Sequence, residues 1–254
     1  MLVVIDIGNT NIVLGTFEGE RLTHSWRVST RRDQTPHEYA VLCRNLFLMD
    51  GVPAERVSGV AISSVVPPLN DSFTHLATEY FGVEPFYIDP VLQGLMPIRY
   101  LHPSEVGADR IVNGREAREL HGAPAIVVDF GTATTFDAVS TEGEYLGGAI
   151  APGIGISAEA LFVRAARLPR IEIIQPDRSI GRTTVESMQA GIFYGYVGLV
   201  DGVLSRMKKE LPGAVVTATG GYAPLIAAEF EGFDHLEQDL TLHGLSICYR
   251  RMSA

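Results

Sequence analysis

The same short pattern occurs twice in the chain, and this repetition constrains the fold more than any other feature of the sequence. Residues 3–17 read VVIDIGNTNIVLGTF, and residues 125–139 read AIVVDFGTATTFDAV. Asp6 matches Asp129, and a glycine follows two residues later in both copies. Each copy passes from an apolar run through an acid and a glycine into a second apolar run. The pattern predicts a strand, a tight turn and a second strand in both halves of the chain.

Further elements repeat around the two turns. A Glu-Gly-Glu hairpin follows each copy and predicts a third strand. Apolar patterning also predicts helices at 38–49, 67–80, 106–120, 184–211 and 240–251, and strands at 57–66, 84–88 and 214–221. We therefore expect an α/β chain of two domains, residues 1–118 and 119–254. The last helix can pack on either domain.

The charge and composition of the chain argue against several classes of function. The formal net charge is −10, whereas nucleic acids and anionic membranes both require clustered positive charge on a partner. The first strand lacks the basic start of a signal peptide, and no apolar run reaches the roughly 20 residues of a membrane span. Cys43 and Cys248 are the only cysteines, too few for a disulfide framework. We expect a cytoplasmic protein with no nucleic-acid or membrane partner.

Both turns carry residues that suit a bound phosphate group. Gly8 and Gly131 have no Cβ, so a phosphate can approach the backbone closely. The side chains that can donate hydrogen bonds to it are Asn9, Thr10, Asn11 and Thr132. The two carboxylates would repel phosphate unless a cation lies between, so they imply Mg²⁺ or another hard cation. If the domains face each other, Asp6 and Asp129 approach one cleft.

Two other observations bear on this phosphate hypothesis. The chain has only two lysines, Lys208 and Lys209, and no Walker-type sequence, so a P-loop nucleotide site is excluded. The alternative is that each segment is an ordinary hairpin, whose Asn and Asp residues tolerate unusual backbone angles. One copy alone favours that alternative. Two copies at matched spacing favour phosphate binding.

The two turns resemble those of the acetate/sugar kinase–Hsp70–actin superfamily. Four further stretches narrow the resemblance: YLHPSEVGADR at 100–110, VDFGTATTFD at 128–137, GGAIAPGIGIS at 147–157 and TTVESMQAG at 183–191. In this order and spacing the chain resembles type III pantothenate kinases over essentially its whole length. The resemblance implies duplicated ribonuclease H-like (actin-like ATPase) domains facing a central cleft. It also implies phosphorylation of pantothenate by ATP to 4′-phosphopantothenate, the first step of coenzyme A synthesis.

The resemblance further implies Mg²⁺, a monovalent cation (K⁺ or NH₄⁺) and a homodimer. It assigns the general base to Asp109 and the monovalent cation to Asp129. Asp6 would hold Mg²⁺ through water, because Mg²⁺ keeps much of its hydration shell. The implied ATP-binding residues are Asp6, Ile7, Gly8, Asn9, Thr10, Asn11, Ile12, Val13 and Thr132. The implied substrate-binding residues are Tyr100, Gly107, Ala108, Asp109, Arg110 and Thr184.

Each of these residues also has an interpretation without a ligand. Asp109 suits the first turn of a helix, where the dipole favours an acid. Arg110 can be a helix-surface residue paired with Glu105 or Glu116, although a guanidinium also suits the pantothenate carboxylate. Thr184 can be the N-cap of the long helix. Either role remains open for each residue.

Two other segments have open interpretations. Thr219-Gly220-Gly221 resembles the superfamily's adenosine-contacting turn, and Tyr222 after it can stack on a base or pack in the core. An apolar stripe at helical spacing predicts a core or dimer face on the long helix: Ile192, Tyr196, Leu199 and Val203.

Three other functions compete with the pantothenate kinase hypothesis. A superfamily phosphohydrolase would use water as the acceptor and would not need the Gly-Ala-Asp-Arg segment. A non-enzymatic transcription accessory factor could lose its catalytic acids, yet Asp6, Asp109 and Asp129 are all present. A kinase for another small alcohol would carry the same phosphate turns.

Overall fold

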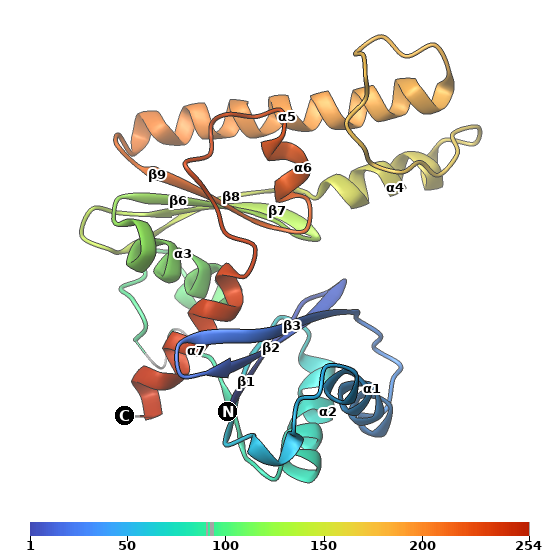
Figure 1. Cartoon of the computed structure of the whole chain (residues 1–254). Helices are drawn as coiled ribbons and strands as arrows, with labels where there is room; N and C mark the ends of the chain where they lie inside the picture. The colour runs from blue at the N-terminus through green and yellow to red at the C-terminus, as the bar shows by residue number, and fades with distance from the viewer. Residues whose placement is uncertain (90, 92–93, 254) are drawn as a thin grey trace. The chain divides into compact units, whose positions relative to one another are not determined.

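The computed structural model describes residues 1–89, 91 and 94–253 and divides them into two compact units (Figure 1). Unit 1 comprises Met1–Leu95, His102–Glu116 and Thr241–Ala254. Unit 2 comprises Met96–Leu101 and Ala117–Leu240. Each unit contains its own five-stranded sheet. No helix in this described part of the chain has the length and apolar character needed to cross a membrane.

The sheet of unit 1 has the order β3-β2-β1-β4-β5. Its strands are β1 (Leu2–Ile7), β2 (Asn11–Glu18), β3 (Arg21–Ser29), β4 (Gly59–Ser64) and β5 (Pro85–Tyr87). The first three strands form an antiparallel meander, and β1, β4 and β5 run parallel to one another. This arrangement places the turn after β1 at the same edge of the sheet as the end of β4.

The sheet of unit 2 repeats this order as β8-β7-β6-β9-β10. Its strands are β6 (Ala125–Phe130), β7 (Ala133–Val139), β8 (Tyr145–Pro152), β9 (Val215–Gly220) and β10 (His235–Leu236). Again the first three strands are antiparallel, and β6, β9 and β10 are parallel. The duplicated α/β architecture expected from the sequence is confirmed.

The repetition extends to an irregularity in the third strand of each sheet. In unit 1 the register between β2 and β3 shifts at Thr16/Phe17, which leaves Thr23 as an extra residue. In unit 2 the register between β7 and β8 shifts at Ala138/Val139, which leaves Leu146 as the extra residue. Both are β-bulges at the same place in the meander.

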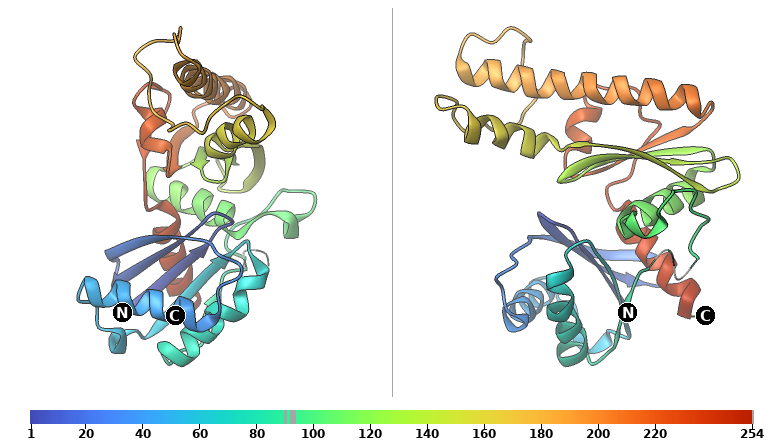
Figure 2. Two further views of the ribbon diagram at one scale, coloured as in Figure 1. Left: turned by 90° about the vertical axis from the view of Figure 1, so that its right-hand side faces the viewer. Right: turned by 180° about the vertical axis from the view of Figure 1, so that it is seen from behind.

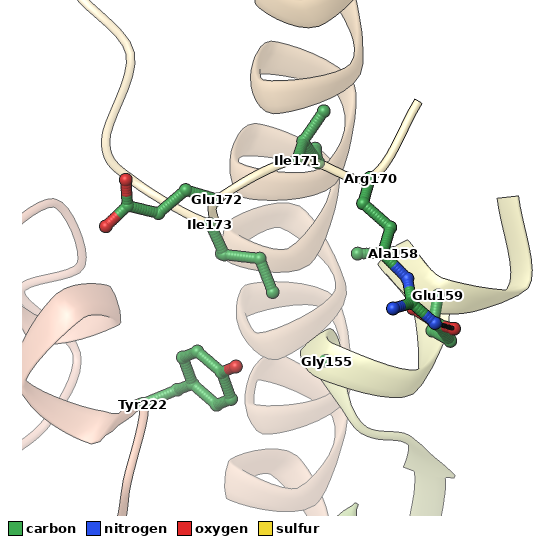
Figure 3. A pocket seen from close by; sticks show the side chains of 8 residues that line it. All are labelled: Gly155, Ala158, Glu159, Arg170, Ile171, Glu172, Ile173 and Tyr222. Atoms are coloured by element: carbon green, nitrogen blue, oxygen red, sulfur yellow. Dashed lines mark hydrogen bonds and ion pairs between the residues drawn. The ribbon is translucent and has the colours of Figure 1, made fainter. Parts of the chain in front are cut away.

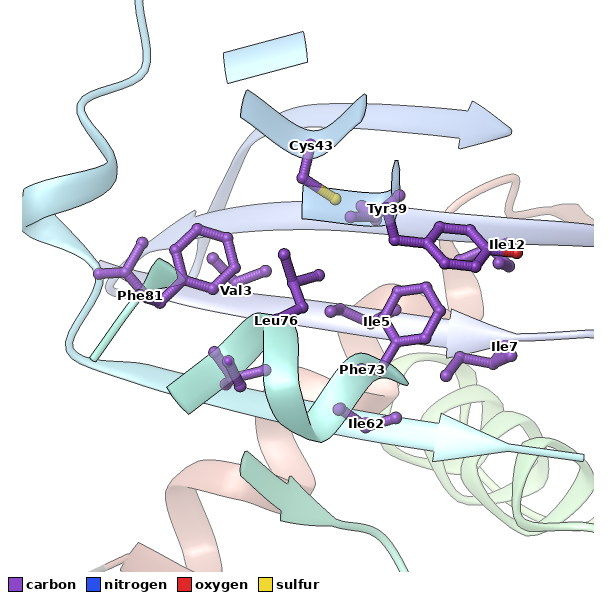
Figure 4. Packing of buried hydrophobic residues seen from close by; sticks show 14 of the residues in the cluster. Val3, Ile5, Ile7, Ile12, Tyr39, Cys43, Ile62, Phe73, Leu76 and Phe81 are labelled. Atoms are coloured by element: carbon purple, nitrogen blue, oxygen red, sulfur yellow. The ribbon is translucent and has the colours of Figure 1, made fainter. Parts of the chain in front are cut away.

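Helices cover both faces of the unit 1 sheet. They are α1 (Pro36–Met49), α2 (Asn70–His75), the start of α3 (Ala108–His121) and α7 (Leu240–Ser253), with short helical turns η1 (Ala54–Arg56), η2 (Pro67–Leu69), η3 (Leu76–Tyr80) and η4 (Pro103–Glu105). Alternate β1 residues point to opposite faces. Ile5 packs with α1 and α2, where Tyr39 and Phe73 are prominent (Figure 4). On the other face Val4 packs with α3 and α7.

Three helices pack on one face of the unit 2 sheet (Figures 1 and 2). They are α4 (Ile154–Arg164), α5 (Thr184–Glu210) and α6 (Ala223–Ala227). On α5, Tyr196 is buried, and the other stripe residues Ile192, Leu199 and Val203 are partly buried against the same cluster. Phe193 and Val200 are fully buried beside them. The α5 stripe therefore contributes to the core of unit 2.

The only tryptophan of the chain, Trp26, lies on the edge strand β3 of unit 1. Its ring stacks on Phe47 of α1 at a centroid distance of 5.2 Å. Its Nε1 donates a 2.6 Å hydrogen bond to Oδ2 of Asp50, which follows α1. Trp26 therefore joins the edge of the sheet to the end of the helix.

Candidate active site

Asp6 lies near the carboxyl end of β1, beside a buried hydroxyl group. Its partner on the parallel strand β4 is Ser63, and residues paired in this way project from the same face of a sheet. Asp6 is partly exposed, whereas Ser63 is fully buried and its Oγ has no hydrogen-bond partner among the described residues. A buried hydroxyl without a partner is costly, so a ligand or water at this place would stabilise it.

The turn after β1 is tightly held. The Gly8 N–H donates to the Asn11 carbonyl oxygen at 3.0 Å, and a Cβ on Gly8 would lie 2.9 Å from that oxygen. Thr30, just beyond β3, donates from Oγ1 to the Gly8 carbonyl at 2.6 Å and from its N–H to the Thr10 carbonyl at 2.9 Å. Asn9 and Thr10 remain exposed. The turn is therefore fixed while its polar side chains are accessible.

Asp109 lies in the first turn of α3, at the same edge of the unit 1 sheet. The Val65 N–H donates to the Ile7 carbonyl at 3.0 Å, and a Cβ on Gly107 would lie 3.7 Å from Val65 Cγ1. These contacts place the start of α3 beside the ends of β1 and β4. The Arg110 N–H donates to Asp109 Oδ1 at 2.9 Å, which orients the carboxylate.

The surroundings of Asp109 favour its protonated form. Burial raises the pKa of the Asp109 carboxyl, and it outweighs the lowering effects of the Arg110 N–H and of the Arg110 guanidinium. Arg110 itself is only 9% exposed. The interpretation of Arg110 as an exposed helix-surface residue is therefore wrong. A buried guanidinium beside the carboxylate makes the pair suited to an anionic substrate.

In unit 2, Asp129 lies near the end of β6 in the position that Asp6 has in unit 1. Its partner on the parallel strand β9 is Thr219, so a hydroxyl residue again stands beside the acid. Gly220 follows with φ of +93°, and a Cβ there would lie 2.6 Å from Asp129 Oδ1. Only glycine allows the backbone to approach the carboxylate this closely.

The turn after β6 is packed against the end of β8. The Gly131 N–H donates to the Ala133 carbonyl at 3.1 Å, and the Gly153 N–H donates to the Thr132 carbonyl at 3.1 Å. A Cβ on Gly153 would lie only 2.1 Å from the Thr132 carbonyl oxygen. Thr132 is exposed. Gly153 therefore has a packing role that holds this turn.

Tyr100 and Thr184, the two predicted substrate residues of unit 2, have different surroundings. Tyr100 is 37% exposed and its ring lies against Gly147, whose Cβ would be 3.3 Å from the ring. Thr184 is exposed at the start of α5. The N-cap of α5 is Thr183, whose side chain accepts from the Glu186 N–H at 3.2 Å. The interpretation of Thr184 as the cap is therefore wrong by one residue.

Tyr222, which follows the glycines after β9, lines a cavity of about 440 Å³ in unit 2 (Figure 3). The cavity lies between α4 and the segment 170–173, where Arg170 donates to Glu159 at 2.6 Å. Tyr222 also packs against the unit 2 core. Its core role is therefore observed, and a stacking role on a base stays a prediction.

The described residues contain no cluster of three or more His, Cys, Asp or Glu side chains that could hold a metal ion. A cation shared with phosphate oxygens needs fewer protein ligands. Asp6 with the unpartnered Ser63 hydroxyl is a hard-oxygen donor set that fits hydrated Mg²⁺. The Asp129 carboxylate lies so close to the Gly220 backbone that a Cβ on residue 220 would clash with it. A single carboxylate beside backbone groups is a donor set that fits a weakly charged cation.

Sequence reasoning missed Ser63, and it named Thr219 in a turn without placing it beside Asp129. Each is a hydroxyl residue within an apolar strand, VAISSVV or AVVTATGG, and only the pairing of the strands places it beside an acid. The usable signal was a polar residue near the end of a run predicted to be a buried strand. Within unit 1 the structure brings the turn after β1 and the start of α3 to one sheet edge. Unit 2 by itself contains Asp129, Thr132, Tyr100 and Thr184.

The two sheets have matching strand orders, and in each sheet an acid-glycine turn follows the first strand, β1 or β6. These features define the actin-like ATPase class of fold. Solved structures share this fold. The activator of 2-hydroxyisocaproyl-CoA dehydratase from Clostridium difficile, with bound ADPNP, has a TM-score of 0.56 at 12% identity, covering 99% of this chain and 97% of that chain. The ethanolamine utilization protein EutJ from Carboxydothermus hydrogenoformans has a TM-score of 0.57 at 14% identity, covering 96% and 88%.

Sequence comparison identifies the family within this class. The family model for type III pantothenate kinase matches residues 2–206. A type III pantothenate kinase from Moorella thermoacetica is 54% identical over 252 residues, covering 99% of both chains. One from Myxococcus xanthus is 54% identical over 255 residues, covering 100% of both. The chain belongs to the type III pantothenate kinase family.

Proposed function

We propose that this protein transfers the γ-phosphoryl group of ATP to the primary hydroxyl of pantothenate and produces 4′-phosphopantothenate. The family assignment supports a kinase with ATP as the phosphoryl donor. The observation that carries the proposal is the Asp109 carboxylate, which the Arg110 N–H orients. It lies at the same sheet edge as residues 6–13, the turn after β1 that we call the phosphate turn. A base at this place is what an alcohol acceptor requires.

In this proposal Asp109 accepts the proton of the pantothenate hydroxyl as the phosphoryl group is transferred. Phosphoryl transfer has a loose transition state, so positioning of the alcohol matters more than the strength of the base. Arg110 binds the carboxylate of pantothenate, and Tyr100, Gly107, Ala108 and Thr184 complete the substrate contacts. Burial raises the pKa of the Asp109 carboxyl, and a carboxylate with a raised pKa is a better proton acceptor than an ordinary aspartate.

The nucleotide contacts in this proposal come from both turns. Backbone N–H groups and side chains of residues 6–13 bind phosphate in unit 1, and Thr132 binds phosphate in unit 2. Asp6 holds Mg²⁺ through water, and Asp129 holds K⁺ or NH₄⁺. Bound cations neutralise the phosphates that a P-loop lysine neutralises elsewhere. The fixed turn at Gly8 and the close approach of Gly220 to Asp129 support these assignments.

We also propose a homodimer, located in the cytoplasm. Large apolar side chains are exposed on unit 2, including Ile150 of the edge strand β8 and Val163 of α4, at 65% and 63%. Both cysteines are free thiols, which suits a reducing compartment. Light scattering coupled to size-exclusion chromatography should give twice the mass of the chain. A monomer mass at micromolar concentration would contradict the homodimer.

An assay with purified protein tests the proposed function directly. We expect ATP-dependent formation of 4′-phosphopantothenate in Mg²⁺, with a higher rate in K⁺ or NH₄⁺ than in Na⁺. Phosphate release without a phosphorylated product would favour a phosphohydrolase. The absence of turnover in every cation would support the transcription accessory factor, and turnover only with another alcohol would replace pantothenate as the substrate.

A further inference from the structure

An exposed arginine contacts the phosphate turn of unit 1 from a segment outside that turn. Arg32 donates from Nη2 to Oδ1 of Asn9 at 2.8 Å. Arg32 belongs to the loop that connects β3 to α1, which Figure 1 shows beside the sheet. Among the described residues Arg32 forms no ion pair, so its charge is not neutralised within this part of the chain.

The backbone that carries Arg32 is fixed on both sides. Before it, Thr30 is hydrogen-bonded to Gly8 and Thr10 of the turn. The buried Tyr39 hydroxyl donates to the Arg31 carbonyl at 2.8 Å and lies 3.1 Å from the Arg31 N–H, which donates to it. After it, Thr35 and Glu38 cap α1. A long side chain on a fixed backbone loses less freedom when it binds a ligand.

The contact also sets the orientation of the Asn9 amide. Its Oδ1 accepts the hydrogen bond from Arg32, so its two N–H groups are the ones that can donate to a ligand. Arginine and amide donors side by side form an environment for an anion. Two acids lie near these donors. Asp33, next to Arg32 in the sequence, is exposed to solvent. The carboxylate of Asp6, in the phosphate turn itself, would repel a phosphate, so a cationic side chain is needed there.

We propose that Arg32 is a phosphate-binding residue, which contacts a terminal phosphate of ATP directly and keeps the Asn9 amide donors directed to the same anion. The inference rests on the proposed function for the identity of the ligand, a nucleoside polyphosphate. It supplies the turn with a cationic side chain, which its own sequence lacks. The phosphate-binding site of unit 1 thus consists of two segments, the phosphate turn (residues 6–13) and Arg32.

Calorimetric titration with the non-hydrolysable analogue ADPNP in Mg²⁺ tests the proposal. For Arg32→Gln we expect a Kd about tenfold higher than for the unchanged protein, because a partly solvated charge-assisted hydrogen bond is lost. Arg31→Gln removes the same charge from the next residue and should leave the Kd unchanged. Adenosine, which has no phosphate, should bind both variants and the unchanged protein equally.

Two results would overturn the proposal. One is an equal Kd for ADPNP in Arg32→Gln and Arg31→Gln. The other is that Arg32→Gln has no further effect in an Asn9→Ala background, which would make Arg32 a positioning residue only. Both measurements work without pantothenate, so a failure of the proposed function in the kinase assay and a failure of this inference are distinguishable.

Discussion

Replacing Asp109 with asparagine should lower kcat for pantothenate phosphorylation by about 10²- to 10⁴-fold, the range expected when a general base is lost. Asparagine keeps an oxygen that can accept from the Arg110 N–H, so the local fold should survive. Steady-state kinetics should show the loss in kcat, with a small change in KM for pantothenate. Near-unchanged turnover would refute the base assignment. Glu105→Gln, a neutralised exposed acid nearby, should retain activity.

The raised pKa of Asp109 predicts two effects of pH, one on the activity of the unchanged protein and one on stability that Asp109→Asn can test. In the unchanged protein, activity should fall as pH falls through the raised pKa, because a protonated carboxyl cannot accept a proton. The folded-state pKa lies above the unfolded value, so ionisation of Asp109 reduces stability as pH rises through that range. The amide of Asp109→Asn cannot ionise, so thermal unfolding of this variant at pH 7 should show a Tm at or above that of the unchanged protein.

A companion variant tests the placement of the same carboxylate. A Cβ on Gly107 would lie 2.4 Å from Asp109 Oδ1, so Gly107→Ala should displace this side chain. We expect a lower kcat, and the effect should largely disappear when Asp109 is already replaced by asparagine, because the two changes act through one group. Additive losses in the double variant would mean that Gly107 acts independently of Asp109.

Replacing Asp129 with alanine should lower kcat by roughly 10²-fold and abolish the difference between K⁺ and Na⁺. The reason is the loss of the carboxylate beside the Gly220 backbone, where the cation is proposed to bind. Rates measured over a K⁺ titration at constant ionic strength check this. Glu142→Ala removes an exposed acid from the β7–β8 hairpin of the same unit and should keep the K⁺ response. A K⁺ response that survives in Asp129→Ala would refute the assignment.

The strands other than the short β10, and their duplication, could be predicted because both depend on local patterns. An acid, a glycine and flanking apolar runs mark β1 and β6 whatever surrounds them. Helix α4 was not predicted, because its sequence follows a glycine-rich stretch that resembles a loop. The structure shows why residue 153, just before α4, must be a glycine: a Cβ there would clash with the carbonyl oxygen of Thr132, in the turn before β7. Such a contact leaves no local pattern.

The candidate site shows the same limit. The acids Asp6, Asp109 and Asp129 stand out in the sequence through their motifs, whereas the positions of Ser63 and Thr219 beside two of these acids follow only from strand pairing. The burial of Arg110 could likewise not be predicted, since it depends on contacts distant in the sequence. Sequence motifs therefore identify the charged residues, whereas packing determines which neighbouring residues change their environment.

The single tryptophan has a practical consequence for experiments on this protein. Because Trp26 belongs to unit 1 and stacks on Phe47, its intrinsic fluorescence is an optical signal from unit 1 alone. Circular dichroism, in contrast, averages over every helix in both units. If the two spectroscopic unfolding curves coincide, the chain melts cooperatively. If they separate, the difference measures the independence of unit 1.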